Sequence, residues 1–380
     1  MKVLLLVEAS SAGVGRHVMD LARGLLAANQ QVHLVYAPER IDARFTAELA
    51  ALPKLKRTCI SMRRGPHWGD FAVRRALRAC IAQHGPFDIV HAHSTKGGFL
   101  AALLPRSYAV PRVYTPHSPL SMNASLGRAA KLAVVAVERH MLRRMQAVIA
   151  VSHEEREHLQ ALGMRVERLH MVPNGIAPPS LPTKQKVRDE LGVPNDAPVV
   201  GFVGRLAEQK NPMLLLHAFA TVHQQLPAAR LLIVGDGPLR SDVEAAARTL
   251  GDSSAVTVLG YRDAQQIMPA FDVLALPSRY EGMPYVLLEA LAAGLPIVAT
   301  PVGGIRQTVD DGVNGIVCHE GTAQCLAAAL RTTLEPATRE RMSLAARKLA
   351  SDFTDSAMAD STLAIYRSLQ GAEKTALETP

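Results

Sequence analysis

Short apolar runs alternate with longer amphipathic stretches from one end of the chain to the other. In the first half, strands are predicted at 3–7, 31–36, 89–91, 112–114 and 148–151, with helices between them such as 14–28, 97–104 and 154–162. A second series of strands is predicted at 199–203, 230–234, 256–259, 273–276, 296–299 and 315–317. Apolar strands that alternate with helices are typical of parallel sheets covered by helices on both faces.

A Pro- and Gly-rich segment, PNGIAPP at 173–179, separates the two series. The sequence therefore predicts an α/β protein with two doubly wound, Rossmann-like domains, the first at 1–176 and the second at 177–356. Residues 357–371 have helical periodicity, and 372–380 are expected to form a tail.

The opening residues resemble a signal peptide only in part. Their apolar run is five residues long and ends at Glu8, so a buried first strand is the better interpretation. No apolar run approaches the ~20 residues of a membrane-spanning helix. We therefore expect a cytoplasmic protein. The four cysteines form no C-x-x-C pair and are expected to be free thiols, although Cys318, His319 and Cys325 lie close enough in sequence to leave a zinc interpretation open.

Positive charge is concentrated in the first domain. Residues 1–178 contain 24 Lys and Arg against 12 Asp and Glu, a net charge of +12, whereas the remainder carries a net charge of −4. The cations cluster at 54–78 and 139–144. Aromatic residues make up only 4%, which disfavours nucleic-acid binding. An anionic membrane surface or a lipid-phosphate acceptor is the better hypothesis, and a merely solvated basic face is the alternative.

Ligands of such folds bind at the carboxyl ends of parallel strands. In the first domain, the loop SSAGVGRH at 10–17 has small residues that allow backbone amides to approach an anion, although a tight turn without a ligand would have the same composition. His91 and His93 lie at the end of the strand predicted at 89–91 and point to the same side, so a metal pair is conceivable. Histidines at a strand end can equally be merely hydrogen-bonded.

In the second domain, the strand at 199–203 leads to Gly204, Arg205 and Lys210, with Pro212 at the expected first position of a helix. Two cations and exposed amides at a helix N-terminus can bind a diphosphate without a metal. The turn VGDGP at 234–238 has either a structural or a ligand-binding role.

The strongest feature is the string PSRYEGMPYVLLEA at 277–290. Glu281 lies in a Gly- and Pro-containing loop, and Glu289 lies about one turn into the next helix. Carboxylates accept paired hydrogen bonds from vicinal hydroxyl groups, so the two residues suit one sugar and one ribose. No Asp-x-Asp, G-x-S-x-G or P-loop motif occurs. We therefore expect no metal and no other cofactor.

These motifs resemble the retaining GT-B glycosyltransferases of family 4, bacterial polysaccharide and lipopolysaccharide enzymes in particular. The resemblance rests on E-G-M-P-x-x-x-x-E at 281–289, AAGLPIVAT at 292–300, VGRL at 203–206, VGDGP at 234–238 and PNGI at 173–176. It implies two domains that face each other across a donor and acceptor cleft, with the helix at 357–371 completing the first domain.

The resemblance also implies residue roles. Arg205 and Lys210 would hold the donor diphosphate, Glu281 the transferred sugar, Glu289 the ribose, and His117 the donor sugar from the first domain. The other donor-binding residues would be Gly13, Gly204, Gly237, Leu259, Tyr261, Gly282, Met283, Pro284 and Leu287. The acceptor side would contain Arg16, His17, His93 and Lys96.

The implied substrates are a nucleotide-diphosphate sugar and a glycan or polyprenyl-diphosphate-linked acceptor, and the basic first domain suits peripheral contact with an anionic membrane. Many relatives have Gly-Gly where this chain has Ala12-Gly13, which is the main departure from the family pattern. Two alternatives stay open: a nucleotide-sugar epimerase of the same fold, and a non-catalytic protein that binds nucleotide sugars.

Overall fold

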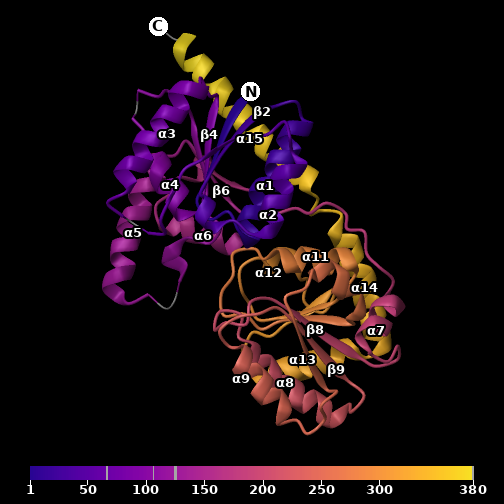
Figure 1. The fold of residues 1–380 in the computed structure, drawn as a ribbon. Coiled ribbons are helices and arrows are strands. Elements are labelled where there is room, and N and C mark those ends of the chain that lie inside the picture. Colours follow the sequence, from indigo (N-terminus) through magenta and orange to yellow (C-terminus); the bar gives the residue numbers. More distant parts are fainter. Residues whose placement is uncertain (66, 106, 124–125, 379–380) are drawn as a thin grey trace. The chain divides into compact units, whose positions relative to one another are not determined.

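The computed structural model describes residues 1–65, 67–105, 107–123 and 126–378. It contains two compact units, one formed by Met1–Gly175 together with the chain from Asp355 onwards, the other by Ile176–Thr354 (Figure 1). The sequence places the corresponding boundaries after 176 and 356, one and two residues later than these.

The first unit is built on a seven-stranded parallel sheet with the order β3-β2-β1-β4-β5-β6-β7. Its strands are β1 (Lys2–Val7), β2 (Gln31–Tyr36), β3 (Lys56–Cys59), β4 (Ile89–His93), β5 (Arg112–Thr115), β6 (Ala147–Ala150) and β7 (Leu169–Met171). Its helices are α1 (Ala12–Ala27), α2 (Ala43–Ala51), α3 (Asp70–His84), α4 (Ser94–Ala102), α5 (Arg128–Leu142), α6 (His153–Ala161) and α15 (Asp355–Glu378).

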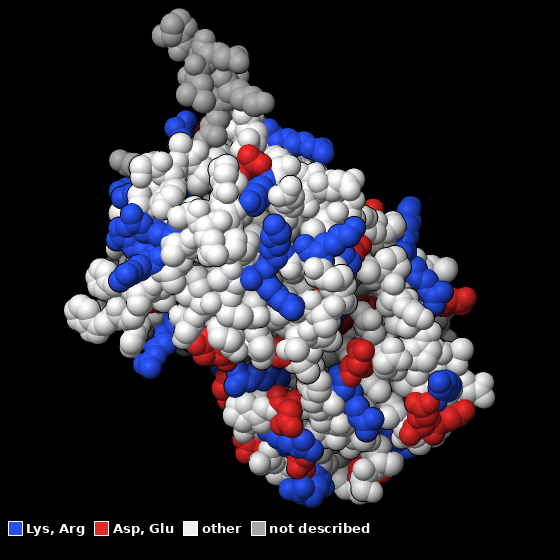
Figure 2. All heavy atoms as spheres, turned by 45° about the horizontal axis from the view of Figure 1, so that its top comes forward, with Lys and Arg blue, Asp and Glu red and all other residues white. Residues whose placement is uncertain are grey.

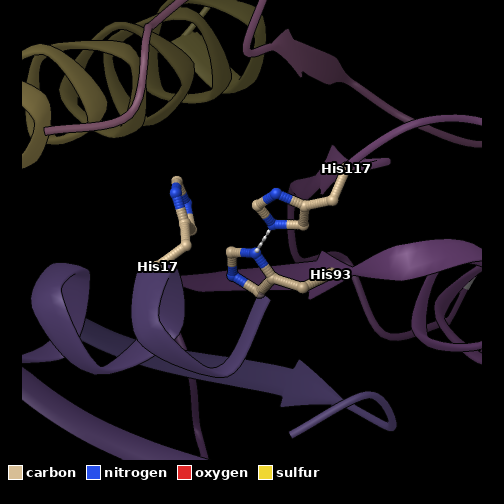
Figure 3. Close-up of side chains that lie close together, drawn as sticks. All are labelled: His17, His93 and His117. Atoms are coloured by element: carbon tan, nitrogen blue, oxygen red, sulfur yellow. Dashed lines mark hydrogen bonds between the residues drawn. The ribbon is translucent and has the colours of Figure 1, made fainter. Parts of the chain in front are cut away.

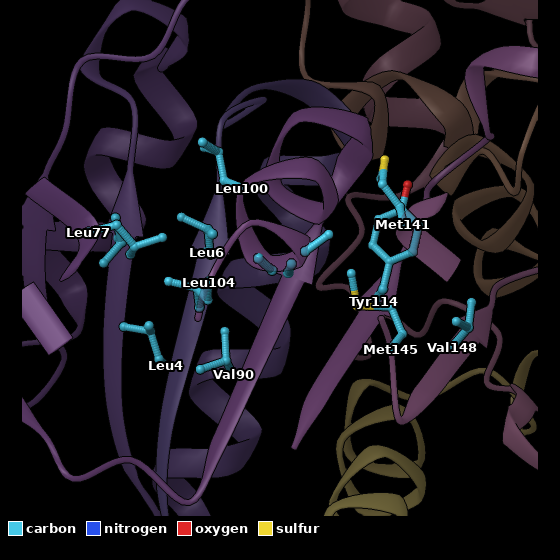
Figure 4. Packing of buried hydrophobic residues seen from close by; sticks show 14 of the residues in the cluster. Leu4, Leu6, Leu77, Val90, Leu100, Leu104, Tyr114, Met141, Met145 and Val148 are labelled. Carbon is cyan, nitrogen blue, oxygen red and sulfur yellow. The ribbon is translucent and has the colours of Figure 1, made fainter. Parts of the chain in front are cut away.

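Helices cover both faces of this sheet because its central strands are apolar on both sides. Leu4 and Leu6 of β1 and Val90 of β4 pack against Leu77 of α3 and Leu100 of α4 on one face (Figure 4). On the other face, alternate residues of β1 pack against α1 and α15, with the Tyr366 side chain fully buried. The last helix therefore completes the core of the first unit.

The second unit repeats this plan with a six-stranded parallel sheet of order β10-β9-β8-β11-β12-β13. Its strands are β8 (Val199–Val203), β9 (Arg230–Val234), β10 (Val256–Gly260), β11 (Val273–Leu276), β12 (Ile297–Ala299) and β13 (Gly315–Val317). Its helices are α7 (Lys184–Leu191), α8 (Pro212–Gln225), α9 (Arg240–Arg248), α10 (Ala264–Ile267), α11 (Tyr285–Ala293), α12 (Ile305–Thr308), α13 (Ala323–Leu334) and α14 (Pro336–Ala350).

The predicted α/β class with two doubly wound domains is confirmed, but two strands of the first unit were not predicted. β3 has the sequence KRTC and is mostly exposed, so it has no apolar run to detect. β7 is three residues long. The backbone of 372–378 continues α15, although a tail was expected there, and residues 379 and 380 lie outside the described residues.

On the face of the first unit that is visible in Figure 2, most of the charged side chains are Lys and Arg. Exposed large apolar side chains of this unit include Trp68 at 87% and Phe71 at 71%, within the basic stretch of 63–78. Within the described part of the chain, no helix has the length and apolar character that crossing a membrane requires.

Candidate functional site

In each unit the strand order reverses direction between two central strands, β1 and β4 in the first and β8 and β11 in the second. The crevice outside the carboxyl ends of such strands is where doubly wound sheets bind ligands. The residues singled out from the sequence lie at these two edges, and each edge is described by itself.

The strand-end loops of the first unit contain unusual backbone. Ala12 has φ +52°, Ser94 +61°, His117 +55° and Ser118 +74°, and these residues follow β1, β4 and β5. Left-handed conformations cost energy in residues with a Cβ and persist only where the surroundings enforce them. Such strain is common at ligand-binding sites. Ala12 thus adopts a conformation that glycine adopts more easily, and its N–H donates to Asp42.

Three histidines come together at this edge. His17 on α1, His93 at the end of β4 and His117 after β5 each contribute one ring nitrogen that lies within 4.8 Å of the other two (Figure 3). His93 Nδ1 is 3.2 Å from His117 Nε2, and His17 Nδ1 is 2.9 Å from Asn174 Oδ1. The structure therefore places three of the predicted site residues in direct proximity.

His91 lies beside this cluster but differs from it. Its ring centroid is 4.1 Å from that of His93, as expected for the same side of the strand. Its two ring nitrogens bond to the hydroxyl groups of Tyr366, at 2.5 Å, and Thr115, at 2.8 Å. His91 is therefore a hydrogen-bonded core residue, which was one of the two interpretations of the sequence.

Burial keeps these imidazoles neutral. It lowers the pKa of His17 to about 4, against a weaker opposing effect of the Asn174 hydrogen bond. Burial likewise lowers the pKa of His93 and His117 well below the usual range, and the neighbouring histidines lower them further. Neutral rings can act as hydrogen-bond partners of hydroxyl groups or as metal ligands.

The two predicted cations of this edge are already paired with carboxylates. Lys96 is buried and donates to Asp70 and, at 2.7 Å, to the Gly65 carbonyl oxygen. Arg16 is buried with its Nε 3.7 Å from Asp20. Gly13 is exposed in the first turn of α1, where backbone N–H groups can meet an anion.

A cavity of about 410 Å³ lies next to these loops. Its charged lining residues are Arg40, Arg64, Lys96, Glu8 and Glu138, and Phe99, Leu120 and Val137 make part of it apolar. Nη1 of Arg40 donates to both carboxylate oxygens of buried Glu8, at 3.0 Å each. Because Arg40 and Lys96 are paired with carboxylates, the cavity combines charged groups of both signs with apolar walls.

In the second unit, the loops after β8 and β9 pack closely. Gly237 has φ +159°, and a Cβ there would lie 2.4 Å from the Leu206 carbonyl oxygen. The N–H of Leu206 bonds to the Asp236 carbonyl oxygen at 2.9 Å. A glycine is therefore required at position 237 for the close approach of the two loops, independently of any contact with a ligand. Gly204 lies beside the Lys210 side chain.

Lys210 and Glu281 form an ion pair between the loops after β8 and β11, with Nζ 2.6 Å from Oε1. The neighbouring backbones are also joined, since the Arg279 N–H donates to the Gln209 carbonyl oxygen at 2.8 Å. Arg205 is exposed at the same strand end. A cationic and a carboxylate group thus lie together at the carboxyl ends of the central strands.

Beyond Glu281 the chain forms a loop that leads into α11, whose N-cap is Pro284. Gly282 and Pro284 are half-buried, Met283 is 5% exposed, and Leu287 is fully buried. Glu289 is 7% exposed on α11. Leu287 therefore faces the core. The Glu289 carboxylate is buried to an extent that requires polar partners.

Leu259 and Tyr261 flank Gly260 at the end of β10, where the sequence expects the nucleobase. Tyr261 is 85% exposed and Leu259 is half-buried. An exposed aromatic ring at a strand end can stack on a base.

The sequence did not single out several residues that organise the first site. Asn174 orients His17, Asp70 pairs with Lys96, and Glu155 accepts from the N–H of Ser118, at 2.9 Å. Burial raises the pKa of Glu155 to about 7, despite two backbone N–H groups that favour the carboxylate. These partners are far from the histidines in sequence, so no local spacing could reveal them.

Two family models match the chain. One, described as "Glycosyltransferase Family 4", matches residues 11–178, and the other, "Glycosyl transferases group 1", matches residues 197–336. Together they cover the strand-end loops of both units.

Among curated proteins, the chain is similar to a D-inositol 3-phosphate glycosyltransferase of Geodermatophilus obscurus, with 33% identity over 310 residues, which is 75% of this chain and 68% of the relative. An alpha-D-kanosaminyltransferase of Streptomyces kanamyceticus is 30% identical over 299 residues, 74% and 77% of the two chains. Among solved structures, Anabaena Alr3699/HepE in complex with UDP has the same fold, with a TM-score of 0.82 at 24% identity over 97% of this chain and 100% of that chain.

Proposed function

The chain belongs to glycosyltransferase family 4 and has its GT-B fold, and from this premise we propose that it is a retaining hexosyltransferase of bacterial surface polysaccharide assembly. It would move a sugar from a nucleotide diphosphate to a glycan or a polyprenyl-diphosphate-linked acceptor. The observation that carries this proposal is the Lys210–Glu281 pair at the central strand ends of the second unit, with Arg205 beside it.

In this mechanism Arg205 and Lys210 stabilise the charge that develops on the departing diphosphate, which is where electrostatic catalysis is most effective. Lys210 has three N–H donors, so it can hold Glu281 and a phosphate oxygen together. Glu281 binds hydroxyl groups of the transferred sugar, Glu289 binds the ribose, and neutral His117 donates to or accepts from the donor sugar.

The bond between the anomeric carbon and the phosphate oxygen breaks as the acceptor oxygen bonds to the same face of that carbon. The acceptor proton passes to an oxygen of the leaving phosphate. This front-side route retains the anomeric configuration and needs no protein carboxylate as nucleophile. The phosphate site consists of cations and backbone amides, so we propose that no metal takes part in it.

The cavity of the first unit supports an acceptor that has both phosphate and apolar parts. Arg64 supplies positive charge, and Phe99, Leu120 and Val137 supply apolar surface. The inositol phosphate relative is named for a phosphorylated acceptor, which is consistent with this hypothesis. The basic surface of the first unit, with exposed Trp68 and Phe71, supports peripheral binding to the cytoplasmic face of an anionic membrane.

The test is a thermal-shift panel of UDP-, GDP- and ADP-sugars, because a ligand that binds only the folded protein raises the melting temperature. The stabilising donor is then incubated with lipid-linked and free glycan acceptors, and the anomeric configuration of the product is read by NMR. Inversion of configuration would refute the retaining mechanism. Isomerised nucleotide sugar formed without an acceptor would identify an epimerase, and binding without turnover on any acceptor would favour the non-catalytic alternative.

A further inference from the structure

The histidine cluster of the first unit has the composition of a transition-metal site. His17, His93 and His117 bring three ring nitrogens within 4.8 Å of one another from three different elements (Figure 3). Imidazole is the preferred neutral ligand of Zn²⁺, and three histidines form a common zinc set that leaves one coordination position open. The sequence suggested His91 and His93 as a conceivable pair, whereas the structure joins His93 to two other histidines.

One ring nitrogen of this cluster has no hydrogen-bond partner among the described residues. His93 Nδ1 pairs with His117 Nε2, but the other ring nitrogen of His93, Nε2, is buried and has no partner among the described residues. Buried polar atoms normally have partners, and an exception calls for an explanation such as a bound ion. Neighbouring His91 has both nitrogens bonded, so burial beside a strand end does not by itself produce the exception.

We propose that His17, His93 and His117 bind a divalent transition-metal ion of the Zn²⁺ class. Zn–N distances of about 2.0–2.1 Å place two ligand nitrogens of a tetrahedral ion about 3.4 Å apart. One ring nitrogen of each of the three histidines lies within 4.8 Å of those of the other two. The ligand nitrogens therefore need movements of an ångström or two, within the reach of side-chain rotation.

Two residues outside the cluster hold the ligands in place. Asn174 Oδ1 lies 2.9 Å from His17 Nδ1, so it can accept a hydrogen bond from the Nδ1–H and leave the Nε2 lone pair available to a metal. Ser118, next to His117, donates its N–H to Glu155 at 2.9 Å and stabilises a strained loop in which His117 itself has φ +55°. A metal-binding histidine fixed by such an outer partner is typical of zinc proteins.

The same unit contains a second group, His33, Cys80 and His84, whose ligand atoms are also close together. Its hydrogen bonding is similarly incomplete, since His33 Nδ1 is buried and has no partner among the described residues. His33 Nε2 is 2.8 Å from the Thr58 hydroxyl, and Cys80 contacts the same hydroxyl at 3.7 Å. This group therefore serves as the internal comparison for the test, since it contains a thiol and the proposed site contains none.

Occupation of the proposed site has a consequence that rests on the proposed function. A metal bound to His117 would occupy the imidazole that we assign to the donor sugar. Zinc should then inhibit the transferase, although the phosphate site in the second unit needs no metal. Inhibition should be relieved by a chelator.

The experiment uses the full chain after removal of metals with a chelator and titrates it with Zn²⁺ by calorimetry and with Co²⁺ by absorption. We expect one equivalent to bind, with a tetrahedral Co²⁺ spectrum and no thiolate charge-transfer band. His17→Ala and His93→Gln should weaken binding at least about 100-fold, and Asn174→Ala about 10- to 100-fold. The matched control, His84→Ala, should bind as the wild type does.

Absence of Zn²⁺ binding by the wild type, or a Co²⁺ thiolate band that His84→Ala removes, would overturn the proposal. Each variant is first checked by circular dichroism, and His17→Ala alone suffices if His93→Gln does not fold. The activity assay separates the two proposals. Normal transfer by a protein that binds no zinc would refute only the metal site, whereas zinc binding without inhibition would refute only the role of His117 in transfer.

Discussion

The ammonium nitrogen of Lys210 lies 2.6 Å from Oε1 of Glu281, and only 15% and 8% of the two side chains are exposed. The pair joins the loops that follow β8 and β11, the two strands at which the sheet order of the second unit reverses. It therefore connects the expected phosphate ligand to the expected sugar ligand before any substrate binds. A change in either residue should affect the other.

Arg205→Ala and Lys210→Ala should each lower kcat by a factor on the order of 100 or more, since each removes a cation that stabilises the departing diphosphate. Lys210→Ala also leaves Glu281 buried without its partner, so its thermal stability must be measured alongside its turnover. Arg248→Ala, an exposed cation on α9, is the control and should behave as the wild type. Near-normal rates for both Arg205→Ala and Lys210→Ala would refute the diphosphate assignment.

Substitution of the two glutamates should affect different steps. Glu281→Ala should severely lower the rate of sugar transfer, because the Glu281 carboxylate holds the reacting sugar. Glu289→Ala should chiefly weaken nucleotide binding, because its carboxylate holds the ribose. Calorimetric titration with the free nucleotide distinguishes the two roles. If Glu289→Ala binds the nucleotide as tightly as the wild type does, the ribose assignment is wrong.

EDTA should leave the rate of sugar transfer unchanged or, where zinc contaminates the preparation, raise it. The donor phosphate site that we propose is made of Arg205, Lys210 and backbone amides, so a chelator has nothing to remove from it. The rate is measured before and after dialysis against EDTA and after addition of Mg²⁺ or Mn²⁺. Activity that EDTA abolishes and a divalent ion restores would contradict the metal-free mechanism.

The sequence predicts the apolar strands well because a buried parallel strand depends mainly on its own residues. The bounds of β2, β8, β9, β11 and β13 equal those predicted. Strand β3 was not predicted because its sequence, KRTC, is polar and exposed. Its pairing with β2 is a tertiary contact that leaves no pattern in the local sequence.

The site of the first unit was less predictable. His17 and Asn174 are bonded across 157 positions of the chain, and no spacing indicates such a contact. Lys96 was predicted to face the acceptor, but it is buried in an ion pair with Asp70. The sequence around a lysine at a strand end does not distinguish these two roles. The left-handed φ of Ala12 was also unexpected, because the residue type argues against it.

Ala12→Gly should stabilise the protein. The left-handed conformation costs a residue with a Cβ about 1–2 kcal/mol, and glycine loses roughly 0.5–1 kcal/mol through its greater freedom in the unfolded chain. We therefore expect the free energy of unfolding to rise by up to about 1 kcal/mol, measured by urea titration. Ala79→Gly on the exposed side of α3 is the matched control and should lower it by about 1 kcal/mol. A similar loss in both variants would show that Ala12 carries no strain.

The final prediction concerns the basic surface of the first unit, defined by Arg63, Arg64, Arg74 and Arg75, with Trp68 and Phe71 among them. Each cation near an anionic membrane contributes ~1 kcal/mol, attenuated within a Debye length, and an exposed Trp adds affinity for the interfacial region. The wild type should therefore co-sediment with vesicles that contain anionic lipid at low salt, and less at high salt.

Charge reversal of the four arginines should abolish this association, and Trp68→Ser should weaken it, while both variants bind nucleotide normally through the other unit. The matched control reverses four exposed cations of the second unit, Arg248, Arg331, Arg341 and Lys348, and should leave vesicle binding intact because only the location of the charge differs. Equal loss in both quadruple variants would indicate an unspecific effect of net charge. A wild-type protein that stays wholly in the supernatant would mean that the basic surface is only solvated and that the acceptor need not be lipid-linked.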